Sequence, residues 1–268
     1  MISIALVGAH GRMGRAIEQA AAGGAGLVIA AWSDDGVAER LESAGAGRTH
    51  PGYTGGRAAG LVDVAKAGDV VIEFSTPGGL RETAAACREL KLPLVSGTTG
   101  LGAADEALLD SLAAVVPVLR ASNFSIGVAA LRRALKTALA SLPESWDIEI
   151  VERHHRAKAD SPSGTALTLA ADAVASRGWG DDALQHGRHG RVGPRPARQI
   201  GMHAIRGGTW VGDHSILLAG SGESLELRHV AEDRSAFALG ALAAARFVAT
   251  AKPGRYAIED ALPPAGRG

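Results

Sequence analysis

Two histidines and a lysine lie close together in the segment from Glu152 to Ala166. These are His154, His155 and Lys158. An imidazole can exchange protons at neutral pH, because its unperturbed pKa is about 6.5. The seven residues 152–158 also contain three fixed cations and one carboxylate. The segment therefore predicts a site that binds a small ligand with more than one carboxylate and transfers a proton to it.

A helix start is predicted directly after this cluster. Pro162 cannot continue a strand or a helix, and Ser163 is a candidate N-cap. The amides of Gly164 and Thr165 would then point out of the helix start, where unpaired amides and the helix dipole bind anions. The residues expected on the packed face of this helix are Leu167, Ala170, Ala171 and Val174.

Two other interpretations of these side chains are open. A basic loop is often only a solvated surface. Zinc is the other possibility, but the chain has neither an HExxH motif nor a cysteine–histidine spacing. The histidines that could gather around zinc are His154, His155, His186 and His189. The adjoining helix start favours the carboxylate site, so no metal is expected. The surrounding cations Arg153, Arg156 and Lys158 are expected to favour neutral imidazole.

The elements that would position a second ligand begin at the N-terminus. The apolar run 2–7 predicts a strand, glycines follow at Gly8, Gly11 and Gly14, and a helix is expected from Arg15 to about residue 22. A strand, a glycine turn and a helix form the context of a dinucleotide site. The spacing is GxxGxxG rather than GxGxxG, and glycine turns are common in a chain with 36 glycines. Asp34 follows a second strand at about the distance expected of the acid that binds ribose hydroxyls.

Three more strands end in small or hydroxylated residues. Strands are expected at 70–74, 93–96 and 118–121, and they lead into 75–79, 97–100 and 122–125. Such residues at successive strand ends are typical of a cofactor crevice at the carboxyl edge of a parallel sheet.

Composition limits the class of protein. At 268 residues the chain has room for two domains. Its 28 acidic and 28 basic residues balance, so no overall field would attract nucleic acid or a membrane surface. Cys87 is the only cysteine, and we expect it to pack in a helix. No signal peptide or membrane span is recognisable, so a cytoplasmic protein is expected.

The region after the site predicts an open, largely antiparallel sheet. Residues 177–199 read as a long loop, in which Arg188, Arg191 and Arg195 are expected to be solvated. Gly207–Gly208 signals a two-residue hairpin between strands 203–206 and 209–218. With 224–230 and the strand before the cluster, the sheet would have about four strands. One face would pack on the helix from Thr165, and the other would join further copies of the chain. A final helix, 235–251, is expected to return to the first domain.

These motifs together resemble the 4-hydroxy-tetrahydrodipicolinate reductase (dihydrodipicolinate reductase) family. The similarity runs nearly end to end, and residues 152–166, with the pattern ExHHRxKxDxPSGTA, are its most specific part. The other motifs that carry it are 7–14, 97–100 and 122–128. The resemblance implies an α/β fold in two domains. A Rossmann-type dinucleotide-binding domain would comprise 1–124 and 235–268. A central α+β domain with an open mixed sheet, 125–234, would bind the substrate and form a homotetramer.

The resemblance also implies the chemistry. The enzyme would be an NAD(P)H-dependent oxidoreductase of diaminopimelate and lysine biosynthesis, reducing a cyclic, imine-containing dicarboxylate. His154 would donate and accept a proton and Lys158 would donate one. The residues expected to hold substrate are His155, Ser163, Gly164 and Thr165. The residues expected to bind the cofactor are Gly8, Ala9, His10, Gly11, Arg12, Met13, Asp34, Gly97, Thr98, Thr99, Ala121, Ser122, Asn123 and Phe124.

One position differs within the family. Some members carry an arginine just after the ribose acid, where this chain has Asp35. A second carboxylate there should repel a 2′-phosphate, so NADH is the expected donor over NADPH, although Arg40 or Arg48 could approach. Two alternatives are another Rossmann-type amino- or oxo-acid dehydrogenase and a non-catalytic NAD(P)-sensing protein. The first has no need of the histidine–lysine cluster, and the second has no need of a proton donor.

Overall fold

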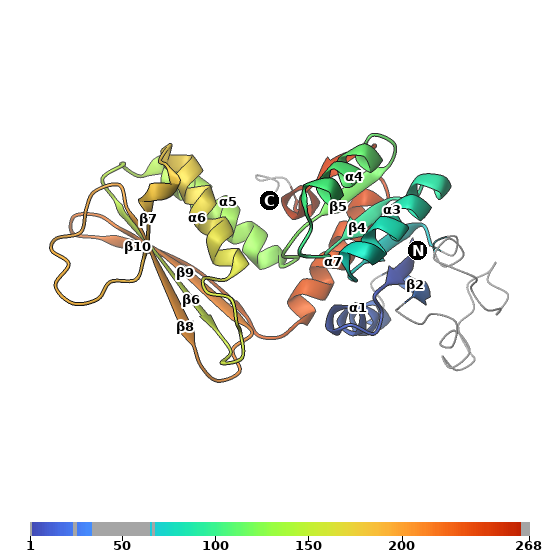
Figure 1. Cartoon of the computed structure of the whole chain (residues 1–268), viewed down its shortest axis with the longest axis horizontal. Coiled ribbons are helices and arrows are strands. Elements are labelled where there is room, and N and C mark those ends of the chain that lie inside the picture. The colour runs from blue at the N-terminus through green and yellow to red at the C-terminus, as the bar shows by residue number, and fades with distance from the viewer. Residues whose placement is uncertain (1, 24–25, 34–64, 66–67, 264–268) are drawn as a thin grey trace. The chain divides into compact units, whose positions relative to one another are not determined.

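The chain divides into two compact units. The computed structural model describes residues 2–23, 26–33, 65 and 68–263. Unit 1 comprises residues 1–126 and 235–268, and unit 2 comprises residues 127–234. The final helix therefore belongs to the first unit. Each unit has its own sheet (Figure 1).

Unit 1 is built on a parallel sheet of six strands. The strand order is β11-β5-β4-β3-β1-β2, and each neighbouring pair is parallel. Its strands are β1 (Ile2–Val7), β2 (Leu27–Ser33), β3 (Val70–Glu73), β4 (Leu94–Ser96), β5 (Pro117–Arg120) and β11 (Gly254–Tyr256). Its helices are α1 (Arg12–Ala22), α3 (Pro77–Leu90), α4 (Ala103–Ala113), α7 (Ser235–Val248) and the 3-10 helix η3 (Ile258–Ala261).

Helices cover both faces of this sheet. Alternate residues of β1, such as Ala5 and Val7, pack with Leu80 of α3 and Leu109 of α4. Cys87 lies in the same cluster, and burial raises its pKa to about 12, with the carboxylate of Glu73 adding to the effect. It is therefore a packing residue. Helices α1 and α7 pack against each other, and α7 contacts β3, β4 and β5. The expected Rossmann-type α/β fold is confirmed.

Unit 2 places two helices on one face of a five-stranded sheet (Figure 1). The strand order is β10-β9-β6-β8-β7. The strands are β6 (Asp147–His154), β7 (Leu184–His186), β8 (Ile200–Arg206), β9 (Gly212–Ala219) and β10 (Ser224–Ala231). The helices are α5 (Ile126–Ser141), α6 (Gly164–Arg177) and the 3-10 helix η2 (Asp181–Ala183). Leucines of α5 and α6 share one core with Ile148 and Ile150 of β6.

Three expectations for unit 2 are wrong. The sheet is mixed, as the family resemblance implied, and not largely antiparallel as the strand pattern suggested, because β6–β8 and β7–β8 are parallel while β6–β9 and β9–β10 are antiparallel. Gly207–Gly208 does not close a hairpin, because β6 lies between β8 and β9. The 207–211 segment instead crosses the end of β6, where the amide of Gly207 bonds the carbonyl of His154. The packed face of α6 is shifted by one residue, to Ala166, Leu169, Ala170 and Ala173, and Leu167 is 43% exposed.

Smaller differences concern element ends. Helix α1 begins at Arg12, one turn earlier than the pattern suggested, and α7 ends at Val248. The expected loop 177–199 contains η2 and β7. Among the described residues, no helix is long and apolar enough to cross a membrane.

Candidate active site

The side chains of β6 alternate between the two faces of its sheet. Residues 148, 150, 152 and 154 are buried, and the residues between them are half-buried. Because successive side chains of a strand point to opposite faces, Glu152 and His154 continue the face on which Ile148 and Ile150 pack beneath α6. The strand thus carries a carboxylate and an imidazole to the end of the core.

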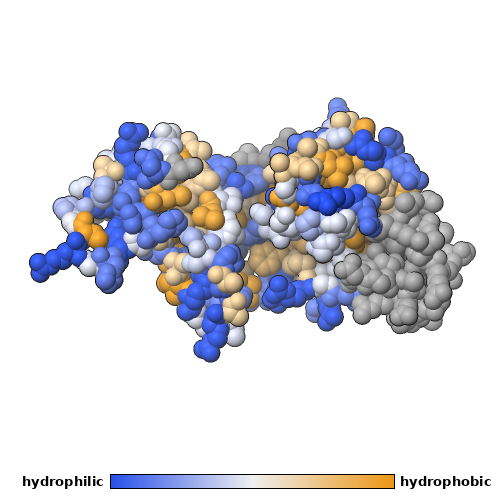
Figure 2. Space-filling view, viewed as in Figure 1, coloured by the Kyte–Doolittle hydropathy of each residue, from blue (hydrophilic) through white to orange (hydrophobic). Residues whose placement is uncertain are grey.

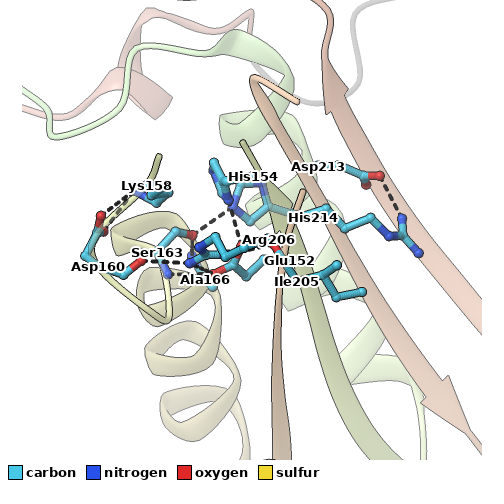
Figure 3. A network of polar contacts seen from close by, with 11 residues as sticks. Glu152, His154, Lys158, Asp160, Ser163, Ala166, Ile205, Arg206, Asp213 and His214 are labelled. Carbon is cyan, nitrogen blue, oxygen red and sulfur yellow. Dashed lines mark hydrogen bonds and ion pairs between the residues drawn. The ribbon is translucent and has the colours of Figure 1, made fainter. Parts of the chain in front are cut away.

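Glu152 is the centre of a buried polar network (Figure 3). Its side chain is 1% exposed. His154 Nδ1 lies 2.7 Å from Glu152 Oε2, and the amide of Ser163 donates to Glu152 Oε1 at 3.0 Å. Two guanidinium nitrogens of Arg206, on β8, donate to the same carboxylate at 2.7 and 2.8 Å. One carboxylate therefore joins two strands and the start of α6.

The donors decide the charge of Glu152. Burial opposes its ionisation, but the bonds from Arg206, His154 and the Ser163 amide outweigh burial and hold the pKa of Glu152 below its ordinary value. An ionised carboxylate only accepts hydrogen bonds. His154 Nδ1 must therefore be the donor, which leaves Nε2 as the nitrogen that can give or take a proton.

Ser163 caps α6, which confirms its predicted place at the helix start. Its hydroxyl accepts a bond from the Ala166 amide at 3.2 Å and lies 3.0 Å from His214 Nε2. His214, on β9, is buried, and burial together with the nearby charge of His154 lowers the pKa of His214 to about 4. It is neutral at physiological pH. Gly164 is exposed and Thr165 half-buried, as the first residues of the helix.

Lys158 lies on the loop between His154 and α6. Its ammonium bonds both carboxylate oxygens of Asp160, at 2.7 and 2.9 Å. A further hydrogen bond from Arg206, to the carbonyl of Asp160 at 2.7 Å, ties this loop to the Glu152 network. The amide of His155 donates to the carbonyl of Trp210 at 2.8 Å, and the His155 side chain is half-buried.

Some arginines are engaged differently from expectation. Arg153 points to the opposite face of the sheet from His154 and bonds Asp213 at 2.7 Å. Arg188 and Arg195 are not simply solvated. Both bond Glu149, at distances of 2.8 to 3.0 Å. Among the described residues, no group of three or more histidine, cysteine or acidic side chains is placed to hold a metal.

The glycine turn of unit 1 fits a phosphate group. Gly8 has a φ of +82°, and a Cβ there would lie 2.2 Å from the carbonyl oxygen of Phe74. A Cβ at Gly14 would lie 2.3 Å from the carbonyl oxygen of Gly8. Both glycines are therefore needed to bring the turn against the sheet. Helix α1 begins at Arg12 after Gly11, with no acidic residue in its first turn. Its free amides and dipole suit an anion.

The other expected cofactor residues follow strands of the same sheet. Gly97, Thr98 and Thr99 follow β4, and 121–124 follow β5. Thr99 and Ser122 are exposed, Asn123 is half-buried, and Ala121 is buried. The Phe124 ring packs 5.1 Å from that of Phe74. These segments share the carboxyl edge of a parallel sheet with the glycine turn, whereas Asp34 lies outside the described residues.

The hydroxyl of Thr98 is used inside the protein. It donates to the buried Glu73 at 2.6 Å. Ser96 and Ser75 donate to the same carboxylate, at 2.8 and 2.5 Å. Glu73 therefore binds together the loops after β3 and β4, and only the backbone of Thr98 is left for a ligand.

Four residues of these networks were not anticipated as functional: Glu73, Glu152, Arg206 and His214. A local signal existed for Glu152, because it lies two residues before His154 on an apolar strand face. Arg206 and His214 come from strands far away in sequence, and no local pattern marks them.

Comparison with known proteins identifies the family. The protein-family model described as "Dihydrodipicolinate reductase, N-terminus" matches residues 2–124. The family model described as "Dihydrodipicolinate reductase, C-terminus" matches residues 127–262. The chain belongs to the dihydrodipicolinate reductase family. Curated 4-hydroxy-tetrahydrodipicolinate reductases support this at full length. The protein of Alkalilimnicola ehrlichii is 44% identical over 97% of this chain and 98% of its own, and that of Zymomonas mobilis is 41% identical over 97% of each.

Solved structures agree with this membership. A dipicolinate-bound dihydrodipicolinate reductase from Paenisporosarcina sp. TG-14 covers 98% of this chain and 100% of its own, with a TM-score of 0.76 and 25% identity. A probable dehydrogenase from Thermotoga maritima has a TM-score of 0.62 at 14% identity and shares the fold alone, covering 97% of this chain and 92% of its own.

The resemblance drawn from the sequence is thus confirmed. The dihydrodipicolinate reductase family consists of NAD(P)H-dependent oxidoreductases of lysine and diaminopimelate biosynthesis, and the expected activity and enzyme class are those of this family. An amino- or oxo-acid dehydrogenase of another type, or a non-catalytic sensor, is not favoured.

Proposed function

We propose that this protein reduces 4-hydroxy-tetrahydrodipicolinate (dihydrodipicolinate) to tetrahydrodipicolinate, with NADH as the preferred donor. The observation that carries the proposal is the Glu152 network, which joins the imidazole of His154 to the start of α6. A proton donor and an anion-binding helix start are thereby held together in unit 2. A related protein has been solved with dipicolinate, a planar dicarboxylate, bound to it.

The helix start would hold the substrate carboxylates. The amide of Gly164, an exposed residue, and the amide and hydroxyl of Thr165 lie at the N-terminus of α6, whose dipole favours anions. His155 would take part in the same binding. Ser163 would act through its cap, because its hydroxyl already serves Ala166 and His214. Fixing the ring in this way removes much of the entropic barrier to reaction.

The reaction needs a proton as well as a hydride. The reduced nicotinamide supplies the hydride when bound. Overall, one hydride and one proton enter the hydroxylated ring, and one water leaves it. His154 Nε2 and Lys158 Nζ are the groups that would give the proton. General acids placed in this way contribute about 10²- to 10⁴-fold.

The cofactor would lie along the carboxyl edge of the unit 1 sheet. The turn from Gly8 to Met13 would hold the pyrophosphate at the start of α1, and Asp34 would bind the adenosine ribose. The 97–99 and 121–124 loops would line the nicotinamide side. The tight Gly8 turn and the absence of acidic residues from the first turn of α1 support this assignment.

An assay with freshly generated substrate tests the activity. Oxidation of NADH should depend on the substrate and be inhibited by 2,6-pyridinedicarboxylate. Replacing Lys158 with alanine should lower kcat far more than it weakens NADH binding. An equal loss of both would contradict the role of Lys158, and no turnover with either donor would contradict the proposed function.

Donor preference has its own test. Asp35 follows the ribose acid and should repel a 2′-phosphate. We expect a higher kcat/KM with NADH. A preference for NADPH above about tenfold, or 1.4 kcal/mol, would contradict this. Asp35→Arg should move the preference toward NADPH.

We further propose that the enzyme is a cytoplasmic homotetramer assembled through the outer face of the unit 2 sheet. The side chains of β6 and its neighbours that point away from α6 include Val151, Ile205, Leu217 and Val230. Ile205 and Val230 are 39% and 50% exposed. The visible surface of unit 2 otherwise mixes hydrophilic and hydrophobic side chains (Figure 2). Light scattering should give the mass of four chains, and Val230→Lys should lower it. A monomeric wild type would refute the assembly.

A further inference from the structure

Glu152 receives all its hydrogen bonds from groups that matter to the proposed reaction. They come from the candidate proton donor His154, from the amide that precedes the anion-binding turn of α6, and from Arg206. Its side chain is 1% exposed, whereas those of His154 and Arg206 are 10% and 20% exposed. Glu152 therefore lies behind the imidazole, too deep to touch a ligand.

Arg206 makes this burial possible. A buried carboxylate is unfavourable unless it is paired and fully hydrogen-bonded. The guanidinium approaches with two nitrogens at 2.7 and 2.8 Å, one to each carboxylate oxygen, and such bidentate pairs are strong and directional. Register places Arg206 opposite His154 on the parallel strand β8. The cation is thus supplied from the adjacent strand, on the same face of the sheet.

Glu152 is the charged group in direct contact with the His154 ring. The other titratable groups nearby are either neutral or paired with other residues. His214 on β9 stacks edge-on, with 5.2 Å between ring centroids, and its pKa of about 4 keeps it neutral. On the following loop, Lys158 is paired with Asp160. Arg153 pairs with Asp213 on the opposite face.

We propose that Glu152 and Arg206 form a positioning pair for the reaction. Glu152 accepts the Nδ1 proton of His154, so Nε2 becomes the nitrogen that exchanges a proton with the substrate. The same carboxylate holds the Ser163 amide and so sets the start of α6. Arg206 balances its charge and, through the Asp160 carbonyl, fixes the loop that carries Lys158. This inference rests on the proposed function, and it adds residues that do not touch the substrate.

Space beside His154 Nε2 supports this assignment. A Cβ at Gly212 would lie 3.1 Å from His154 Nε2. Because residue 212 of β9 is glycine, no side chain from this position crowds Nε2, while the other ring nitrogen is held by Glu152.

The pH dependence of kcat/KM distinguishes positioning from simple stabilisation. The alkaline limb of the profile reports loss of the catalytic proton. Glu152→Gln removes the negative charge that favours the imidazolium, so the limb should move about 1–2 pH units lower and kcat should fall about 10- to 100-fold. Arg206→Met leaves that charge uncompensated, so the limb should move higher. Arg206→Lys, which keeps the charge but not the bidentate geometry, should leave the limb in place and lower kcat.

A matched control variant tests whether the change in the pH profile is specific to Glu152. Glu149→Gln removes a comparable carboxylate from the opposite face of β6 and should leave the profile unchanged. The proposal would be overturned if the alkaline limb moved in the same direction in Glu152→Gln and Arg206→Met. It would also be overturned if the limb did not move in either variant although both were folded. Should the variants not fold, the wild type still decides. Nitrogen NMR of neutral His154 should show a proton on Nδ1 and none on Nε2. The opposite tautomer would refute the pair, whether or not the protein turns over the proposed substrate.

Discussion

The two faces of β6 carry the same kinds of side chain and use them differently. On the face beneath α6, Glu152 is bonded to Arg206 and His154. On the other face, Glu149 is bonded to Arg188, Arg195 and His203. Each cluster therefore combines a glutamate, a histidine and arginine. Their side-chain composition does not distinguish a site from a structural ion cluster.

The two clusters differ in their surroundings. The Glu152 side chain is 1% exposed and accepts a hydrogen bond from a backbone amide at the start of a helix, whereas that of Glu149 is 23% exposed and is held by the side chains of Arg188, Arg195 and His203. Of the two clusters, the first adjoins the N-terminus of α6, where we propose that the substrate carboxylates bind. A histidine held by a buried carboxylate becomes useful for catalysis when a substrate can be fixed beside it.

Replacing the histidine of each cluster should give the largest difference between the two. His154→Gln should lower kcat by about a hundredfold or more, because the proton donor is lost. His203→Gln should leave kcat unchanged and lower only the melting temperature. Steady-state kinetics and thermal unfolding of both variants measure the contrast. Equal losses of kcat would show that the two clusters do not differ in function.

The stability of the fold at acid pH should depend on the Glu149 cluster. Burial opposes ionisation of Glu149, but bonds from Arg188, His203 and Arg195 outweigh it and lower its pKa from 4.5 to about 2. A depressed pKa stabilises the fold above the unfolded value, and this stabilisation is lost as the pH falls from about 4.5 toward 2. The free energy of unfolding of the wild type should therefore exceed that of Glu149→Gln by about 2–3 kcal/mol near neutral pH. Urea unfolding at both ends of this window should show the difference shrinking. A constant difference would contradict the assignment.

Much of the comparison could be expected from local sequence. The period-two pattern of β6 and the helix start at Ser163 place His154, Gly164 and Thr165 in one region. Strand, glycine turn and helix likewise predict the Gly8 turn. These features depend on neighbours in sequence, which a pattern can report.

Strand order could not be read in the same way. The Gly207–Gly208 pair satisfies the rule for a tight hairpin, yet β6 separates the strands on either side. This order brings Arg206 and His214 to Glu152 from opposite sides. Long-range pairing is decided by the packing of whole strands, so the identity of these partners was not available from local pattern. The one-residue error in the packed face of α6 has a related cause, since alanine and leucine fill half of the positions of that helix and lie on more than one of its faces.

Two glycines give a finer test of the comparison. A Cβ at Gly212 would lie 3.1 Å from His154 Nε2, and a Cβ at Gly201 would lie 1.8 Å from Glu149 Oε2. Gly212→Ala should lower kcat about tenfold by crowding the exchanging nitrogen, with little change in stability. Gly201→Ala should displace Glu149 from its arginines, which lowers stability by about 1–3 kcal/mol and spares kcat. Reversed effects would mean that the clusters have been assigned the wrong roles.

The smallest expected effect concerns the ion pairs at the edge of each cluster. Asp160 bonds Lys158 with a side chain that is 61% exposed, and Asp147 bonds Arg195 with one that is 47% exposed. Exposed pairs contribute about 0–1 kcal/mol. The bound substrate ring would compete with Asp160 for the Lys158 ammonium, so Asp160→Asn should lower KM about two- to fivefold, whereas Asp147→Asn should not change it. Because screening weakens exposed pairs, the effect of Asp160→Asn should diminish at high salt. A raised KM would instead mean that Asp160 orients Lys158 for binding.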